Sequence, residues 1–333
     1  MPSRIANPFP ASSLICKLLT LNLNIVELWA ELGDITTSRL VFVQHGWADT
    51  NRVMLRLAEI LKNDLPPDVK VSAPNLGWWR TWREFAPLKQ KVEEDAQALI
   101  AQYPLASVDI IGHSMGGLIW LEILADHPEW WSKVRSLVLL ASPVGGSDLA
   151  RIFDPLGWLP LIARHLGKDR RQIASKIASR IPTLAIAGDW DNGSDGTVVV
   201  GCTRFLHAHW QVVKGAYHAQ MRLHPEVIAS IRSFWQNPQV ATLADNTANQ
   251  ILQYIYSLSL TDAHPRDLKF ATAIANLRAG FSLWQWYSPL QIRHLFVTDH
   301  RGELIYAGFA GWADAQKIDQ AIAHLVGNFG TKN

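Results

Sequence analysis

The sequence predicts an α/β fold with a mostly parallel sheet covered by helices, and three observations support this class. From residue 38 onward, short β-branched runs alternate with longer stretches of helical periodicity, which is the pattern of a parallel sheet with helices on both faces. Of the 333 residues, 48% are apolar and 18% are charged, so the chain can fill a sizeable core. A change of composition after Trp235 indicates a second, smaller unit.

Six apolar runs are expected to be the strands of the large unit, because each is short, rich in branched residues and followed by Gly, Ser or Asn. They are RLVFVQHG (39–46), VKVSAPN (69–75), SVDIIG (107–112), VRSLVLLAS (134–142), IPTLAIAG (181–188) and WQVVKG (210–215). Helices are predicted in LKQKVEEDAQALIAQYP (88–104), GLIWLEILADHP (117–128) and PEVIASIRSFWQ (225–236). Each predicted helix follows a predicted strand, as crossover connections in a parallel sheet require.

The segment between the fourth and fifth of these runs has no strand character. A structureless loop of this length is uncommon inside a compact unit, so we expect an inserted helical lid over about 146–180. The second half of the segment is basic, with Arg164, Lys168, Arg170, Arg171, Lys176 and Arg180. These side chains are interpreted either as a solvated helix face or as a basic rim that attracts anionic head groups or a phosphorylated acyl carrier.

Composition limits the compartment and the partners. The formal charge of +2 is too small and too dispersed for a nucleic-acid surface, and two distant cysteines, Cys16 and Cys202, indicate neither a disulfide framework nor a metal cluster. Residues 1–36 are leucine-rich but interrupted by Lys17 and by asparagines. We therefore expect a cytoplasmic protein with an N-terminal packing arm, and peripheral contact of the arm or the lid with a membrane as the alternative.

The stretch IIGHSMGGL (110–118) carries the most specific motif. Its Gly112-x-Ser114-x-Gly116 pattern follows a predicted strand and precedes a predicted helix, the context in which a strained turn exposes a nucleophilic serine. A plain glycine-rich turn is the alternative, and it would rarely have both flanks. A serine hydroxyl needs a base to take its proton and an acid to orient that base.

His218 is the favoured base, because it follows the last predicted strand and precedes the last helix of the large unit. A loop there returns to the carboxyl edge of the sheet, where Ser114 is expected. His224 directly precedes a proline and is better explained as a helix cap, while His207 and His209 precede the last strand and belong at the opposite end of the sheet.

The acid is sought in the loop AGDWDNGSDGTVVV (187–200), which offers Asp189, Asp191 and Asp195. Each could be a turn former whose carboxylate binds its own backbone. Asp195 is favoured, followed by Asp191, because the chain re-enters apolar structure directly after Asp195 and can hold its carboxylate rigidly.

Residues 37–240 resemble the α/β-hydrolase superfamily, and within it the lipase and esterase branch, in VFVQHGW, IIGHSMGG, ASPVGGSD, AGDWDNGSDGTVVV and GAYHAQMRLHPEV. The resemblance implies an α/β-hydrolase fold, a cofactor-free and metal-free serine hydrolase, and an oxyanion hole formed by the backbone N–H groups of Trp47 and Met115. The family's His-Gly turn maps onto His45 and Gly46. His113 is expected to pack beside the nucleophile rather than to react.

The substrate is less defined by the sequence. Trp78 and Trp79, with nearby Trp82, either line an acyl pocket or cover the sheet edge. We expect cleavage of a small-molecule or lipid acyl ester, with acyl thioester or phospholipid hydrolysis as the alternative. A non-catalytic binding or scaffold protein is the alternative from another class.

Residues 241–333 are predicted to form a small accessory α+β unit with no assigned chemistry. Helices are expected at about 247–258 and 267–280, a hairpin in IRHLFVTDHRGELIYAGF (292–309), and a helix in DAQKIDQAIAHLVGN (314–328). This unit could bind a partner, recruit substrate or complete the core.

Overall fold

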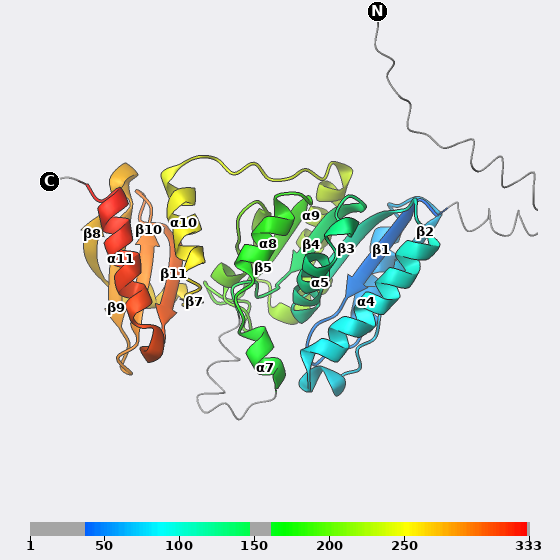
Figure 1. Cartoon of the computed structure of the whole chain (residues 1–333), viewed down its shortest axis with the longest axis horizontal. Helices are drawn as coiled ribbons and strands as arrows, with labels where there is room; N and C mark the ends of the chain where they lie inside the picture. Colours follow the sequence, from blue (N-terminus) through cyan, green and yellow to red (C-terminus); the bar gives the residue numbers. More distant parts are fainter. Residues whose placement is uncertain (1–36, 147–160, 332–333) are drawn as a thin grey trace, which may run out of the picture.

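The computed structural model describes residues 37–146 and 161–331, which form two units joined by an extended segment (Figure 1). The larger contains one six-stranded sheet, in the order β2-β1-β3-β4-β5-β6, and every neighbouring pair is parallel. Its strands are β1 (Arg39–Gln44), β2 (Val69–Ser72), β3 (Ser107–His113), β4 (Val134–Leu140), β5 (Thr183–Asp189) and β6 (His209–Lys214). All six predicted strands are confirmed, and the arrangement is an α/β-hydrolase fold.

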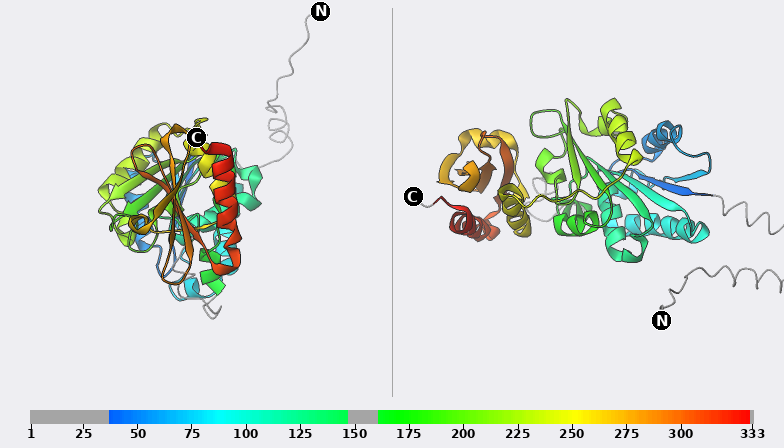
Figure 2. Two further views of the ribbon diagram at one scale, coloured as in Figure 1. Left: turned by 90° about the vertical axis from the view of Figure 1, so that its left-hand side faces the viewer. Right: turned by 90° about the horizontal axis from the view of Figure 1, so that it is seen from above.

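Helices cover both faces of this sheet (Figure 2). These helices are α3 (Arg52–Lys62), α4 (Phe85–Gln102), α5 (Met115–Asp126), α8 (Arg171–Ala178) and α9 (Pro225–Gln236), and short 3₁₀ turns are η1 (Arg80–Trp82), η2 (Pro128–Trp130), η3 (Val200–Thr203) and η4 (His218–Arg222). Alternate residues of β1 face opposite layers, since Leu40 and Phe42 pack with α4, α5 and α8, whereas Val41 and Val43 pack with α3 and α9. We call residues 37–236 the hydrolase unit.

The sequence prediction omits α3, although its signal is present. Met54, Leu57, Ala58 and Leu61 are buried at spacings of three and four residues, which is the apolar stripe of a helix lying on a core.

Part of the segment expected to form a lid packs directly on the sheet. It contains α7 (Leu161–Leu166) and α8, and the apolar face of α8, with Ala174 and Ile177, is buried in the core against the sheet. Residues 171–178 therefore cover the sheet itself. Residues 147–160 of the expected lid, like the N-terminal arm 1–36, lie outside the described residues.

Arg170 and Arg171 form neither a solvated helix face nor a basic rim, because each of these two residues is only 1% exposed. The Arg170 guanidinium donates to Glu122 Oε1 from Nε and from a terminal nitrogen, at 2.8 and 2.6 Å. Arg171 instead reaches Asp262 of the second unit. The chain uses these two cations to hold buried structure together rather than to present a positive surface.

Residues 247–329, which we call the C-terminal unit, contain an antiparallel sheet in the order β7-β11-β10-β9-β8. Its strands are β7 (Thr261–Asp262), β8 (Thr272–Asn276), β9 (Ser282–Tyr287), β10 (Arg293–Thr298) and β11 (Leu304–Ala310), with helices α10 (Thr247–Ser257) and α11 (Gln316–Phe329) and 3₁₀ turns η5 (Pro265–Phe270), η6 (Arg278–Gly280) and η7 (Trp312–Asp314). The two helices cover one face of this sheet and share a core with it. The predicted α10, hairpin and α11 are confirmed.

The helix predicted at 267–280 is wrong. This stretch contains η5, the edge strand β8 and η6, and β8 pairs with β9, which the sequence prediction misses. Alanine and leucine favour a helix here locally, but hydrogen bonds to β9 outweigh that weak preference, and Ala279 and Gly280 have positive φ angles of 58° and 77°.

A buried ion pair joins the two units. A terminal nitrogen of Arg171 donates to both carboxylate oxygens of Asp262 at 2.8 and 2.7 Å, and also to Gly201 O at 3.1 Å. The guanidinium lies 4.5 Å from the ring centre of Tyr256. Burial lowers the pKa of Arg171, but the Asp262 carboxylate more than offsets this, so the pKa is raised and the pair stays charged.

Candidate active site

Ser114 lies where β3 ends and α5 begins, in a strained backbone conformation with φ 53° and ψ −126°. Its N–H donates to Leu140 O at 2.8 Å, which holds the turn against β4. The flanking glycines are required by close backbone approach, because a Cβ on Gly112 would overlap Gly117 and a Cβ on Gly116 would overlap Gln44 O. The turn therefore has the geometry that the motif predicts, and it leaves Ser114 partly exposed.

The order of the strands places this turn at a topological switch point. The chain runs from β1 outward to β2 and then returns to β3 on the other side of β1. In open parallel sheets, the crevice between such strands at their carboxyl ends is the usual ligand site. The residues after β1 and β3, including Gly46 and Ser114, meet in this crevice.

Asp195 and His218 are joined by a hydrogen bond. His218 Nδ1 lies 2.7 Å from Asp195 Oδ2, and the His218 backbone N–H donates to Asp195 O at 2.9 Å. The other carboxylate oxygen accepts the N–H groups of Thr197 and Val198 at 2.9 and 2.7 Å. Because Asp195 is only 2% exposed and held on both oxygens, it favours Nδ1–H on His218 and leaves Nε2 as the basic atom.

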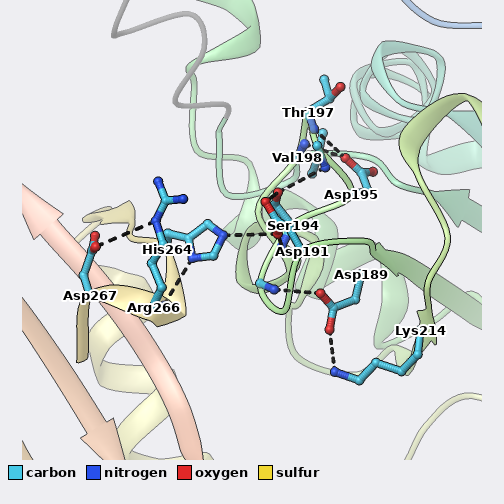
Figure 3. A network of polar contacts seen from close by, with 12 residues as sticks. Asp189, Asp191, Ser194, Asp195, Thr197, Val198, Lys214, His264, Arg266 and Asp267 are labelled. Atoms are coloured by element: carbon cyan, nitrogen blue, oxygen red, sulfur yellow. Dashed lines mark hydrogen bonds and ion pairs between the residues drawn. The ribbon is translucent and has the colours of Figure 1, made fainter. Parts of the chain in front are cut away.

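Asp189 and Asp191 have other partners in the same loop and beside it (Figure 3). Asp189 accepts the N–H of Gly193 at 2.6 Å and forms an ion pair with Lys214. Asp191 accepts the N–H and the hydroxyl of Ser194 at 2.7 and 3.0 Å. Of the three acids that the sequence leaves open, only Asp195 makes a described contact with the candidate base.

His113 lies under His218 and is buried. Its Nε2 is 3.1 Å from His218 O, and the two ring centres are 4.8 Å apart. Burial, and then the proximity of His218, keeps the pKa of His113 well below its usual value. The neutral ring therefore donates Nε2–H to the His218 carbonyl, which fits the expectation that His113 packs beside the nucleophile.

Two of the other histidines near the end of the hydrolase unit, His224 and His209, have structural contacts. His224 caps α9 by accepting the N–H of Glu226 at 3.3 Å, as the sequence predicts. His209 starts β6 at the opposite edge of the sheet, and its Nε2 lies 3.0 Å from Gln239 O. His207, before β6, has a positive φ of 64°.

The His-Gly turn after β1 lies directly against Ser114. A Cβ on Gly46 would be 2.8 Å from Ser114 Cβ and 3.2 Å from the backbone nitrogen of Met115. Met115 is the first residue of α5, so its N–H has no carbonyl partner one turn earlier in the helix. This close approach brings the backbone of Gly46 beside the Met115 backbone nitrogen.

Hydrogen bonds fix this turn from two sides. His45 Nε2 accepts the N–H of Leu76 at 3.0 Å, so Nδ1 carries the proton and donates to Gly46 O at 3.0 Å. Burial lowers the pKa of His45, which favours this neutral form. Thr81, which the sequence interpretation misses, accepts the N–H of Ala48 at 3.0 Å and donates to Trp78 O at 2.6 Å; no local sequence signal marks this contact.

Four tryptophans gather beside the turn. Trp47 and Trp82 have ring centres 4.1 Å apart, Trp78 lies 5.5 Å from Trp82, and Trp79 packs edge-on against Trp78 at 4.5 Å. Trp78 and Trp79 remain 38% and 79% exposed. The exposed faces of Trp78 and Trp79 give the cluster an apolar surface that solvent reaches.

Among residues 37–146 and 161–331, no three His, Cys, Asp or Glu side chains gather as metal ligands would. Within these same ranges, no helix combines the length and the apolar character needed to cross a bilayer.

Fold and site together define a protein of the α/β-hydrolase fold with a serine turn at the carboxyl edge of its sheet. A family model described as "alpha/beta hydrolase fold" matches residues 86–168, which include β3, Ser114 and α5. For residues 86–168, this match confirms the resemblance to the α/β-hydrolase superfamily. No curated protein matches the chain.

Solved structures with a similar fold include three bacterial proteins. The mature lipase BlEst2 of Bacillus licheniformis is 15% identical, with 62% of this chain and 94% of that chain covered and a TM-score of 0.45. Est1E of Butyrivibrio proteoclasticus is 14% identical, with 61% and 88% covered and a TM-score of 0.47. A thermostable carboxyl esterase of Bacillus coagulans is 16% identical, with 60% and 90% covered and a TM-score of 0.42. Similarities this distant do not define the substrate of this chain.

Proposed function

We propose that this protein is a serine hydrolase that cleaves a carboxylic acyl ester through an acyl-enzyme intermediate. The observation that carries the proposal is the Asp195–His218 hydrogen bond of 2.7 Å, with the His218 carbonyl 3.1 Å from Nε2 of His113, the residue before the strained Ser114. The chemistry needs a nucleophile, a base and an acid that orients the base. Ser114, His218 and Asp195 would fill these roles.

The proposed reaction has two halves. Ser114 Oγ attacks the ester carbonyl carbon while His218 Nε2 takes the hydroxyl proton, and the N–H groups of Trp47 and Met115 stabilise the oxyanion. The intermediate then expels the alcohol, which receives its proton from His218. In the second half, His218 deprotonates a water molecule that attacks the acyl-enzyme, and the acid leaves as Ser114 regains its proton. Trp78 and Trp79 would contact the acyl chain through their exposed faces.

The test is covalent labelling by a fluorophosphonate, followed by intact mass, together with hydrolysis of short p-nitrophenyl esters. We expect one adduct on the wild-type protein and none on Ser114→Ala or His218→Ala. Ester turnover should fall by about 10⁴-fold or more in Ser114→Ala. Ser230→Ala on α9, whose hydroxyl donates to Glu226 O, is the matched serine control and should label normally. Unchanged hydrolysis in a folded Ser114→Ala protein would overturn the proposal.

A second candidate, hydrolysis of an acyl thioester or phospholipid, rests on a different basic surface from the one that the sequence indicated. A cleft of about 520 Å³ beside the His-Gly turn is lined by Leu76, by the cationic side chains Arg80, Arg83 and Lys91, and by one acidic side chain, Glu84. Anionic head groups would be attracted there. Arg80→Gln with Arg83→Gln should then raise KM for an anionic substrate and not for a neutral ester, and added salt should reduce the difference.

A further inference from the structure

The loop that carries Asp195 is in direct contact with the C-terminal unit (Figure 3). His264 stands at the start of η5, and its Nε2 lies 3.2 Å from Asp191 Oδ1. Its Nδ1 accepts the N–H of Arg266 at 3.2 Å. Because Nδ1 is an acceptor there, the proton of a neutral ring is on Nε2, and His264 donates to the Asp191 carboxylate.

Asp191 also holds Ser194, the residue before Asp195. The two carboxylate oxygens of Asp191 hold Ser194, through its N–H at 2.7 Å and its hydroxyl at 3.0 Å. The Ser194 hydroxyl oxygen in turn accepts the N–H of Gly196 at 3.1 Å. Asp195 therefore lies between two residues that are held, directly or through Ser194, by Asp191.

The packing of the two units at this point is close. A Cβ on Gly193 would lie 2.5 Å from His264 Cε1 and 2.7 Å from Pro265 Cδ. The His264 side chain is only 12% exposed, whereas Asp191 is 40% exposed. The loop therefore rests on the C-terminal unit on one side and binds His218 on the other.

We propose that the C-terminal unit positions the acid of the candidate triad, with His264 as the positioning residue that holds Asp191 and thereby the Ser194–Gly196 turn around Asp195. This inference rests on the proposed function, and it assigns the C-terminal unit a role in the same site. His264 touches neither substrate nor reacting atoms in this role. Since small displacements of catalytic groups can cost about 100-fold in rate, the contact should affect turnover more than substrate binding.

Two substitutions of His264 separate positioning from helix capping. His264→Ala removes both the cap on Arg266 and the bond to Asp191. His264→Asn keeps a good capping side chain that is too short to reach Asp191. We expect both variants to lower kcat and the rate of fluorophosphonate labelling by about tenfold with KM nearly unchanged. Wild-type rates in either folded variant would overturn the inference.

His224 offers a matched control for the cap. It precedes Pro225 as His264 precedes Pro265, and it accepts an N–H two residues later in the same way. Within the described residues it has no bond to Asp191. His224→Ala should therefore keep wild-type labelling rates. Loss of activity equal to that of His264→Ala would show that capping alone explains the effect and would overturn the inference.

A double-variant cycle tests the route through Asp191. If His264 acts through this carboxylate, His264→Ala should cause no further loss in a protein that already carries Asp191→Ala. If the losses of activity in the two single variants multiply in the double variant, His264 acts elsewhere and the inference fails.

Proton NMR supplies a readout that needs no turnover. The Nδ1–H of His218, hydrogen-bonded to Asp195, should give a low-field signal that disappears in Asp195→Ala. We expect this signal to shift or broaden in His264→Ala, and an unchanged signal would overturn the inference. If the wild-type protein shows the signal and its sensitivity to His264 but resists labelling, the proposed ester hydrolysis fails while the positioning role stands.

Discussion

The two sheets of this protein differ in how they can build a site. In the hydrolase unit all neighbouring strands are parallel, so the loops after β1, β3, β5 and β6 leave from one edge. Gly46, Ser114, Asp195 and His218 lie on those loops. In the C-terminal unit the strands are antiparallel, and successive strand ends point in opposite directions.

This difference fits the position of the candidate site in the hydrolase unit. A parallel sheet collects side chains from distant parts of the chain at one edge, while an antiparallel sheet with a helical layer mainly provides a packed surface. Two of the contacts between the C-terminal unit and the hydrolase unit differ in character, namely the buried Arg171–Asp262 pair and the partly exposed His264–Asp191 bond. The first holds the units together, and the second reaches the candidate site.

The largest effect is expected from Asp262→Ala, which tests whether the units depend on each other for stability. The variant would leave Arg171 buried without its carboxylate, and breaking a buried pair in this way typically costs about 3–5 kcal/mol. We expect the free energy of unfolding, measured by urea denaturation, to fall by this amount.

Asp319→Ala is the control for this experiment. Asp319 pairs with Arg293 at the surface, where its side chain is 68% exposed, and such pairs contribute little. The control should unfold like the wild-type protein. Equal stability of Asp262→Ala and wild type would break the comparison, since the buried pair would then not join the units.

The sequence predicted the hydrolase unit better than the C-terminal unit for a physical reason. Buried parallel strands are continuous apolar runs, and β3, β4 and β5 are almost wholly buried. The edge strand β8 is mostly exposed and contains alanines that also suit a helix. Its strand character comes from pairing with β9, which local sequence does not encode.

One part of the candidate site could likewise be predicted from the sequence, and another part could not. Ser114, Asp195 and His218 were selected from motif context and chain order, and the structure brings Asp195 and His218 into contact. The contact of Asp191 with His264 spans 73 residues and depends on how two units pack. The His264-Pro265 pair signals a helix cap from sequence, but no sequence pattern indicates what its second nitrogen contacts.

An intermediate effect is expected from adding one methyl group to a glycine in each unit. In Gly116→Ala the new Cβ would overlap Gln44 O at the serine turn, and overpacking of this kind costs about 1–3 kcal/mol. In Gly327→Ala, on α11, the new Cβ meets nothing within 4 Å, so better helix propensity should stabilise by about 0.5–1 kcal/mol. Thermal unfolding of both variants measures the contrast, and a neutral Gly116→Ala would contradict the close packing of the turn.

The smallest effect concerns pH and His113. Burial holds the pKa of His113 well below its usual value in the folded protein, whereas the unfolded chain takes up the proton near about pH 6.5. The unfolded state therefore binds more protons below that pH, and stability falls as the pH is lowered, by at most about 1.4 kcal/mol per pH unit from this group.

His113→Gln keeps an N–H that can donate to His218 O but cannot titrate. Urea denaturation at pH 7.5, 6.5 and 5.5 should show a shallower loss of stability toward acid in His113→Gln than in wild type. Because all other titrating groups are shared, parallel curves for the two proteins would mean that the serine turn does not hold His113 neutral.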